Sequence, residues 1–191
     1  GGGDEIIGPA SVAFSPEGKT LYLTGYWWRE MYMGGGNCLH GVMKMDYEGN
    51  AEPAVFAGQM KADGGEGNGP SQFCVPTSVA CDSQGRVYVT DHMNDRVQIF
   101  DPAGKLLKTI ASPKPARVLV SPKTGEIWVF SWPVIGISND ILKKTGFDWG
   151  KTPSKLTRYA SFDDPKQVSS ADFPLAVGPV RIKSAGTGPI Q

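Results

Sequence analysis

The chain of 191 residues is long enough for one domain with a sizeable core, and its 40% hydrophobic and 10% aromatic content is typical of a globular protein. Nineteen basic and nineteen acidic residues leave a formal net charge of zero, and no basic cluster is longer than Lys143-Lys144, so nucleic acid is not an expected partner. No apolar stretch approaches the roughly 20 residues that a membrane-spanning helix needs.

The first predicted element is a β-hairpin that begins at Pro9. Residues 9–24 place a short apolar strand, a turn containing Gly18, and a second strand in which Tyr stands between Leu residues, and this order is typical of a hairpin. A second hairpin follows over residues 41–57. Two consecutive hairpins give four antiparallel strands, so residues 9–57 predict one blade of a β-propeller.

The same order of strands recurs twice along the chain. A hairpin over residues 76–91 is followed by one over 96–110, whose Asp101-Pro-Ala-Gly104 turn has Pro at a favoured position. Three copies predict an all-β fold: a single partial β-propeller over residues 1–191, with about three to four four-stranded antiparallel blades visible. The expected blades span residues 9–57, 76–110 and 115–163, with residues 175–191 as a candidate start of a further blade.

Residues 67–101 resemble one complete repeat of the NHL family. They contain, in order, Gly-Asn-Gly-Pro-Ser-Gln-Phe, the strand from Pro76, Val-Tyr-Val-Thr-Asp, and Asn-Asp-Arg-Val-Gln-Ile-Phe-Asp. The other two copies match only the strand and turn pattern. The resemblance implies a six-bladed propeller in an extracellular or periplasmic protein, with Asp91 capping the loop backbone.

Three or four blades leave apolar end faces that must be covered. We therefore expect the remaining propeller blades as partners, in further sequence or, as the less favoured alternative, in another protein chain.

Loop lengths indicate which face of the propeller binds. When strands are lettered a to d from the channel outward, the a–b and c–d turns share one face and are short here, so we expect that face to be bare. The b–c connections over residues 25–40 and 131–154 are long and rise from the opposite face, as does the glycine-rich segment 58–73. We expect the binding residues on this second face.

The long loops hold most of the candidate binding residues. The candidates are Trp27, Trp28, Arg29, Tyr32, His40, His92, Trp132 and Trp149. Aromatic rings beside Arg and His suit a flat or sugar-like small molecule, or anchor a protein partner. The alternative is that these rings, with Tyr26 and Phe147, only pack the loops onto the blades.

One helix is expected inside the third blade's long loop. Residues 138–146 begin with Ser138, contain two apolar positions followed by two lysines, and end at Gly146. A helix-start residue, late basic residues and a Gly stop predict a short helix that orders the loop.

Metal and disulfide chemistry have few candidates in this sequence. His40 and His92 are its only histidines, and they do not stand in a zinc-binding spacing. The one metal site that we consider is a pair of these two histidines across neighbouring blades.

Of the three cysteines, Cys38 and Cys74 are the better candidates for a disulfide. Cys74 and Cys81 are separated by an expected strand, whose seven residues span roughly 23 Å. Three free thiols are the alternative.

Two enzyme groups share the expected architecture: peptide-amidating lyases and gluconolactonase-like hydrolases, which hold zinc or calcium beside the Pro that opens strand a. The matching residues here are Ala10, Thr77 and Ala116, and none is a ligand of either kind. We therefore expect a scaffold propeller that binds a protein or carbohydrate partner. The alternative is a lactonase-like or lyase-like hydrolase, or an oxidoreductase subunit, whose calcium, zinc or cofactor site is completed by blades or chains beyond this sequence.

Overall fold

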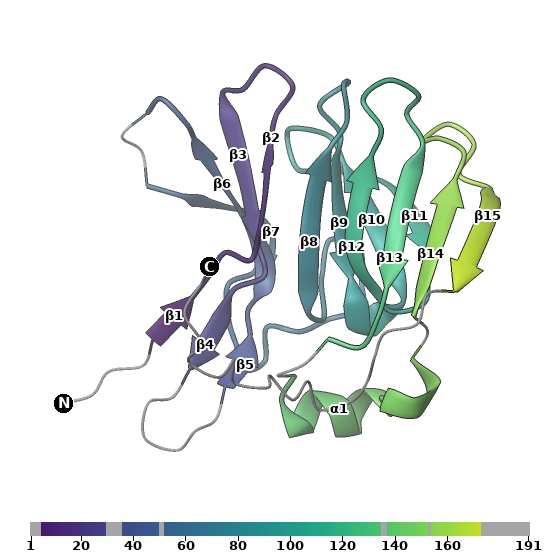
Figure 1. The fold of residues 1–191 in the computed structure, drawn as a ribbon. Coiled ribbons are helices and arrows are strands. Elements are labelled where there is room, and N and C mark those ends of the chain that lie inside the picture. The colour runs from purple at the N-terminus through teal and green to yellow at the C-terminus, as the bar shows by residue number, and fades with distance from the viewer. Residues whose placement is uncertain (1–4, 30–35, 50–51, 135–136, 153, 173–191) are drawn as a thin grey trace, which may run out of the picture.

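The computed structural model of the protein describes residues 5–29, 36–49, 52–134, 137–152 and 154–172. Among them, three four-stranded antiparallel sheets stand next to one another (Figure 1), and their first strands lie against each other. This arrangement confirms the expected all-β propeller blades. No helix among the described residues is long and apolar enough to cross a membrane.

Each blade is a simple meander, because its strands pair in chain order. The first blade consists of β2 (Ser11–Phe14), β3 (Thr20–Thr24), β6 (His40–Asp46) and β7 (Ala54–Gln59). The second consists of β8 (Pro76–Cys81), β9 (Val87–Asp91), β10 (Arg96–Phe100) and β11 (Leu106–Ala111). The third consists of β12 (Pro115–Val120), β13 (Ile127–Ser131), β14 (Lys155–Tyr159) and β15 (Gln167–Asp172).

The third blade extends beyond residue 163, where the sequence pattern placed its end. Its outermost strand, β15, begins at Gln167, and all six of its residues are exposed. An exposed polar strand has no apolar alternation, so its sequence resembles that of a loop. The candidate further blade over residues 175–191 lies outside the described residues.

Smaller elements gather at one end of the blades (Figure 1). They comprise a three-stranded sheet of β1 (Glu5–Ile7), β4 (Trp27–Arg29) and β5 (Gly36–Cys38), the helix α1 (Asn139–Thr145), and the short turns η1 (His92–Asn94) and η2 (Trp149–Lys151). We call this end the loop face, and the opposite end, where the hairpin turns lie, the turn face. The expected helix is confirmed: Ser138 caps its start, and Gly146 ends it with a φ of 64°.

The core lies between adjacent blades. Tyr22, Phe56 and Phe100 pack between the first and second blades, and Tyr88 and Ile127 pack between the second and third. Large apolar and aromatic side chains fill both interfaces, so burial of apolar surface holds neighbouring blades together.

Serine side chains also join the innermost strands. Ser11 Oγ accepts a hydrogen bond from Val79 N at 3.0 Å, and Ser78 Oγ accepts one from Val118 N at 3.2 Å. The same position in the third blade holds Arg117, which is exposed. A serine of the inner strand thus contacts the next inner strand at both blade interfaces described here.

The outward faces of the first and third blades stay apolar. Val12, Phe14 and Val55 on the first blade and Leu119 on the third are each about half exposed. On β2, these residues alternate with Ser11 and Ala13, which face the second blade. The two faces are those that the expected further blades would cover.

Candidate functional site

Asp91 anchors the loop face of the second blade. Its fully buried carboxylate accepts hydrogen bonds from Cys74 N at 2.7 Å, from Arg96 Nε at 2.7 Å and from the Asn94 amide at 2.9 and 3.0 Å. Burial raises the pKa of Asp91, while these donors act in the opposite direction. The expected capping role of Asp91 is confirmed.

Arg96 extends the same network to the glycine-rich segment. Its guanidinium donates to the carbonyl oxygens of Asn68, Gly69 and Gln72, each at 2.9 Å. Most of the polar residues that resemble the NHL repeat are thus occupied in holding loop backbone. Their role is to position the loop face.

His40 and His92 each bind the beginning of the next blade. His40 Nδ1 accepts from Val75 N at 3.1 Å, which leaves the ring proton on Nε2. His92 Nδ1 lies 3.3 Å from Pro115 O, and because a carbonyl only accepts, this nitrogen carries the proton. Both rings are fully buried, and burial lowers both pKa values, that of His92 to about 4.

The Nε2 atoms of both histidines have no hydrogen-bond partner among the described residues. Buried polar atoms are rarely left in this state, so these two have the capacity for a further contact. Among the same residues, no group of three or more His, Cys, Asp or Glu side chains is placed to hold a metal ion. The metal pair of His40 and His92 stays a prediction.

The strand starts of these three blades do not fit a calcium or zinc site. Thr77 is the one polar residue at the three matching positions, and its hydroxyl contacts Thr90 Oγ1 at 2.9 Å and Ala116 O at 2.8 Å. The other two positions, Ala10 and Ala116, have no ligand atom in their side chains. Thr77 therefore has a structural role, and we assign no metal chemistry to these positions.

The aromatic loop residues have different surroundings. Trp27 and Phe147 pack against the buried cluster that contains Val75 and Ile141, which is the packing role considered as an alternative. Trp132 is partly buried, with its ring centroid 6.2 Å from that of Phe130. Tyr32 lies outside the described residues. Trp149 begins η2, and its side chain also lies outside them.

An apolar pair of one exposed and one half-buried residue lies on the small sheet of the loop face. Ile6 in β1 pairs directly with Trp28 in β4, so their side chains share one face of the sheet. Ile6 is 63% exposed, Trp28 is half-buried, and the exposed Arg29 follows it at the end of β4. Sequence reasoning missed Ile6 because three residues before the first blade give no periodic signal.

A loop-face cavity of about 360 Å³ lies between the glycine-rich segment and α1. It is lined by Glu66, Gly67, Asn68, Cys74, Asn94, Ile141, Lys144 and Thr145. Lys144 Nζ bonds Glu66 Oε1 at 2.8 Å and so ties α1 to the segment. Burial raises the pKa of the Cys74 thiol to about 12, so this thiol is protonated and is not a nucleophile at neutral pH.

The three cysteines are free thiols in the structure. Cys38 and Cys74 lie in one buried cluster, and Cys81 is partly buried in the second blade. The Cys38–Cys74 disulfide, which would suit an extracellular or periplasmic protein, stays a prediction.

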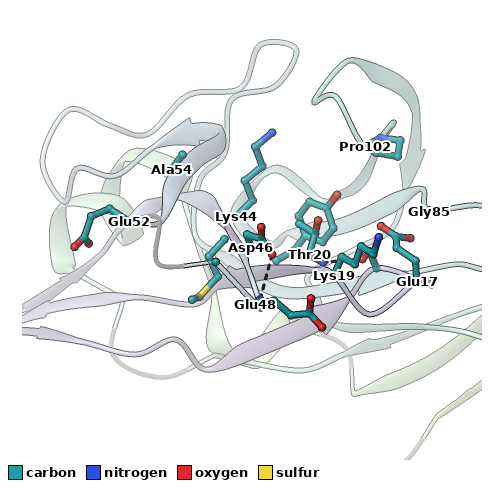
Figure 2. A pocket seen from close by; sticks show the side chains of 14 residues that line it. Glu17, Lys19, Thr20, Lys44, Asp46, Glu48, Glu52, Ala54, Gly85 and Pro102 are labelled. Atoms are coloured by element: carbon teal, nitrogen blue, oxygen red, sulfur yellow. Dashed lines mark hydrogen bonds between the residues drawn. The ribbon is translucent and has the colours of Figure 1, made fainter.

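A larger cavity of about 610 Å³ opens on the turn face, between the first and second blades (Figure 2). It is lined by Ser15, Glu17, Lys19, Thr20, Tyr22, Lys44, Met45, Asp46, Glu48, Gly49, Glu52, Ala54, Gly85 and Pro102. The turns on this face are as short as expected, with Gly18, Gly85, Gly104 and Gly125 closing them, and the cavity forms between the side chains of neighbouring turns. Short turns predict few loop residues, but the side chains between two neighbouring turns decide whether a cavity forms.

Comparison with known proteins gives the family context. Residues 3–131 match the family described as SMP-30/Gluconolactonase/LRE-like region. The human NHL repeat-containing protein 3 is 53% identical over 38 residues, which are 20% of this chain and 11% of that protein. Protein lin-41 of Caenorhabditis elegans is 38% identical over 58 residues, 30% of this chain and 5% of that protein. The matches thus cover a small share of the curated relatives' length.

Solved structures share the fold. A luciferin-regenerating enzyme superposes with a TM-score of 0.52 and 16% identity, covering 81% of this chain and 45% of that one. A putative 6-phosphogluconolactonase from Bacteroides uniformis superposes with a TM-score of 0.50 and 13% identity, covering 85% of this chain and 40% of that one. The chain thus spans less than half the length of either protein.

Proposed function

We propose that this chain, which belongs to the SMP-30/gluconolactonase/LRE-like family, forms three blades of a propeller. We further propose that the loop face of these blades binds a protein partner. The supporting observation is the Ile6–Trp28 pair, in which an exposed Ile6 lies beside a half-buried Trp28 on the small loop-face sheet. Neighbouring apolar and aromatic side chains that form a contiguous surface patch mark interaction sites, and aromatic residues are common anchors there.

The pair rests on an ordered support. Strand β4 lies between β1 and β5, and its Trp27 packs into the cluster that also holds Ile141 of α1. An interface residue held in one position loses little conformational entropy on binding. The support therefore favours binding by Trp28 without rearrangement.

The chemistry of the pair favours protein over carbohydrate. Ile6 has an aliphatic side chain without donors or acceptors, whereas sugars are recognised mainly through hydrogen bonds and ring stacking. Arg29 beside the pair adds a residue type that is enriched at protein interfaces. A protein with an apolar pocket and an acidic rim fits this combination.

Site-specific photo-crosslinking of the full-length protein in its native extract tests this function. A benzophenone amino acid at position 6 should give one discrete protein adduct, and this adduct should be lost when Trp28→Ala is added. The same probe at Gln84, exposed in the β8–β9 turn of the turn face, is the control and should not give this adduct. The proposal fails if both positions give the same products or if position 6 gives none.

A second candidate function is lactone hydrolysis by the complete propeller. The family match over residues 3–131 and the buried Nε2 atoms of His40 and His92 favour it. The described strand starts do not fit a metal, so further blades would supply the ligands. Metal-dependent hydrolysis of gluconolactone by the full-length protein, abolished by His92→Gln in a variant that stays folded, would support this candidate.

A further inference from the structure

The first two blades differ at one equivalent position of the turn face. Tyr22 pairs with Ala13 in the first blade as Tyr88 pairs with Ala80 in the second, so the two tyrosines occupy the same place. Both contribute to the core at the following blade interface. A difference in their surroundings therefore reflects the neighbouring side chains.

In the second blade, the tyrosine hydroxyl has a hydrogen-bond acceptor. Tyr88 Oη donates to Asp82 Oδ2 at 2.8 Å, and Arg86 Nε donates to the same oxygen at 2.6 Å. The Arg86 guanidinium also lies 4.0 Å from the ring centre of Phe162 in the third blade. This network fills the turn-face side of the second interface.

The first blade lacks that network. Ser15 stands where the second blade has Asp82, because both backbone N–H groups close the same hairpin turn. The Ser15 hydroxyl accepts from Thr20 N at 2.9 Å, and Thr20 stands where the second blade has Arg86. These smaller side chains leave the cavity of about 610 Å³.

Tyr22 lines this cavity with an unused donor. The residue is 2% exposed, and its ring centre lies 4.9 Å from that of Phe56 in an edge-to-face contact. Its hydroxyl makes no hydrogen bond within the described part of the chain, and it is not one of the buried unpaired atoms there, so it is accessible from the cavity. Burial, with Cys81 and Glu17 nearby, raises the pKa of Tyr22 to about 12, so the hydroxyl keeps its proton at neutral pH.

Charged side chains surround the cavity, as Figure 2 shows. They are the carboxylates of Glu17, Asp46, Glu48 and Glu52 and the ammonium groups of Lys19 and Lys44. The excess of carboxylates favours a ligand with a cationic group, whereas the Tyr22 hydroxyl offers a donor to an acceptor group on the ligand. A metal ion does not fit, because no metal-binding group of side chains exists among the described residues.

We propose that this turn-face cavity binds a small zwitterion of the α-amino acid type. The ligand carboxylate accepts from Tyr22 Oη and pairs with Lys44, while its ammonium group lies among the rim carboxylates. A neutral polyol offers no cation, and a simple amine offers no acceptor for Tyr22. The site lies on the face opposite the proposed partner surface, so either can exist without the other.

Calorimetric titration of the full-length protein with each of the twenty standard amino acids tests the site. At least one should bind with one-to-one stoichiometry, and Tyr22→Phe should weaken that binding by about tenfold or more, the loss of one charge-assisted hydrogen bond. Tyr88→Phe is the matched control, because it removes the same atom from the second blade, and it should leave the affinity unchanged.

A second variant keeps the test decisive if Tyr22→Phe does not fold. Ser15→Asp introduces the partner that the second blade has, so it should satisfy Tyr22, fill part of the cavity and abolish amino acid binding. The assignment is overturned if no amino acid binds, if Tyr22→Phe and Ser15→Asp both bind like the wild type, or if glucose or glycerol binds here instead.

Discussion

Single buried side chains determine the shape of the loop face. Asp91 and Arg96 hold the glycine-rich segment, and His40 and His92 each hold the first residues of the next blade. Each of these residues begins, ends or directly follows a strand, where its side chain reaches loop backbone. Hydrogen bonds of this kind position a binding surface without touching what it binds.

Asp91→Ala should destabilise the full-length protein strongly. The change leaves Arg96 and the Cys74 N–H without their acceptor in a buried site, and breaking a buried ion pair costs about 3–5 kcal/mol. Urea unfolding measures the loss. Asp163→Ala, which removes an exposed carboxylate, should change stability by less than about 0.5 kcal/mol, and equal losses in both variants would contradict the role given to Asp91.

His92 should make stability depend on pH in the mildly acidic range. The pKa of His92 is about 4 in the folded protein against an ordinary value of 6.5. Between these values only the unfolded chain binds the proton, so the free energy of unfolding falls as the pH falls, by about 3 kcal/mol in total. Urea unfolding between pH 7 and pH 4 measures this slope.

The His92→Gln variant isolates that contribution. Glutamine does not titrate but keeps a hydrogen-bond donor, so its unfolding free energy should fall less steeply over the same pH range. Other groups, including Asp91, titrate equally in both proteins. Parallel slopes in the variant and the wild type would show that His92 is not buried as described.

At the scale of single elements, regular hairpins could be predicted and short or fully exposed strands could not. The blade strands have strong apolar patterns, and α1 has Ser138 and Gly146 at its two ends, so both kinds of element were found from sequence. The β1–β4–β5 sheet was missed because three-residue strands show no period. The outer strand of the third blade was expected to end by residue 163, but β15 lies further along the chain, because its exposed residues give no apolar pattern that would locate it. The turn-face cavity depends on which small side chains meet across two blades, which requires the fold.

Gly58 should be far less tolerant of substitution than Gly18, although both have a φ of 73°. A Cβ at Gly58 would collide with His40 O and lie 2.6 Å from Phe73 Cδ2, whereas one at Gly18 would meet nothing within 4 Å. Gly18→Ala should therefore cost about 1 kcal/mol of left-handed strain, and Gly58→Ala about 3 kcal/mol more. Thermal and urea unfolding of the two variants compare these costs, and similar losses would contradict the packing of segment 58–73.

At the scale of the whole molecule, the outward faces of the first and third blades should be covered in the complete protein. Phe14 and Leu119 are each 51% exposed in these three blades, and apolar blade faces are stable only when packed. Hydroxyl-radical footprinting of the full-length protein should find both residues protected. Leu107, exposed on the second blade, is the internal control and should react. Labelling of Phe14 and Leu119 as strong as that of Leu107 would contradict the prediction that the outward blade faces are covered.

The fold explains how one scaffold presents two separate surfaces. The loop face has the Ile6–Trp28 pair on a packed support, and the turn face has a charged cavity into which the Tyr22 hydroxyl opens. The strands between them belong to blade cores and inner-strand contacts, which keep each surface fixed. Changes on one face should therefore leave binding at the other unchanged.

The central claim is that the loop face binds a protein partner. The affinity of the full-length protein for the partner that is crosslinked through position 6 tests this claim most directly. Trp28→Ala should weaken this affinity by about thirtyfold, because a buried aromatic anchor contributes about 2 kcal/mol or more to an interface. Gln84→Ala, on the turn face, should bind as the wild type does. Wild-type affinity of Trp28→Ala would contradict the assignment of the loop face as the binding surface.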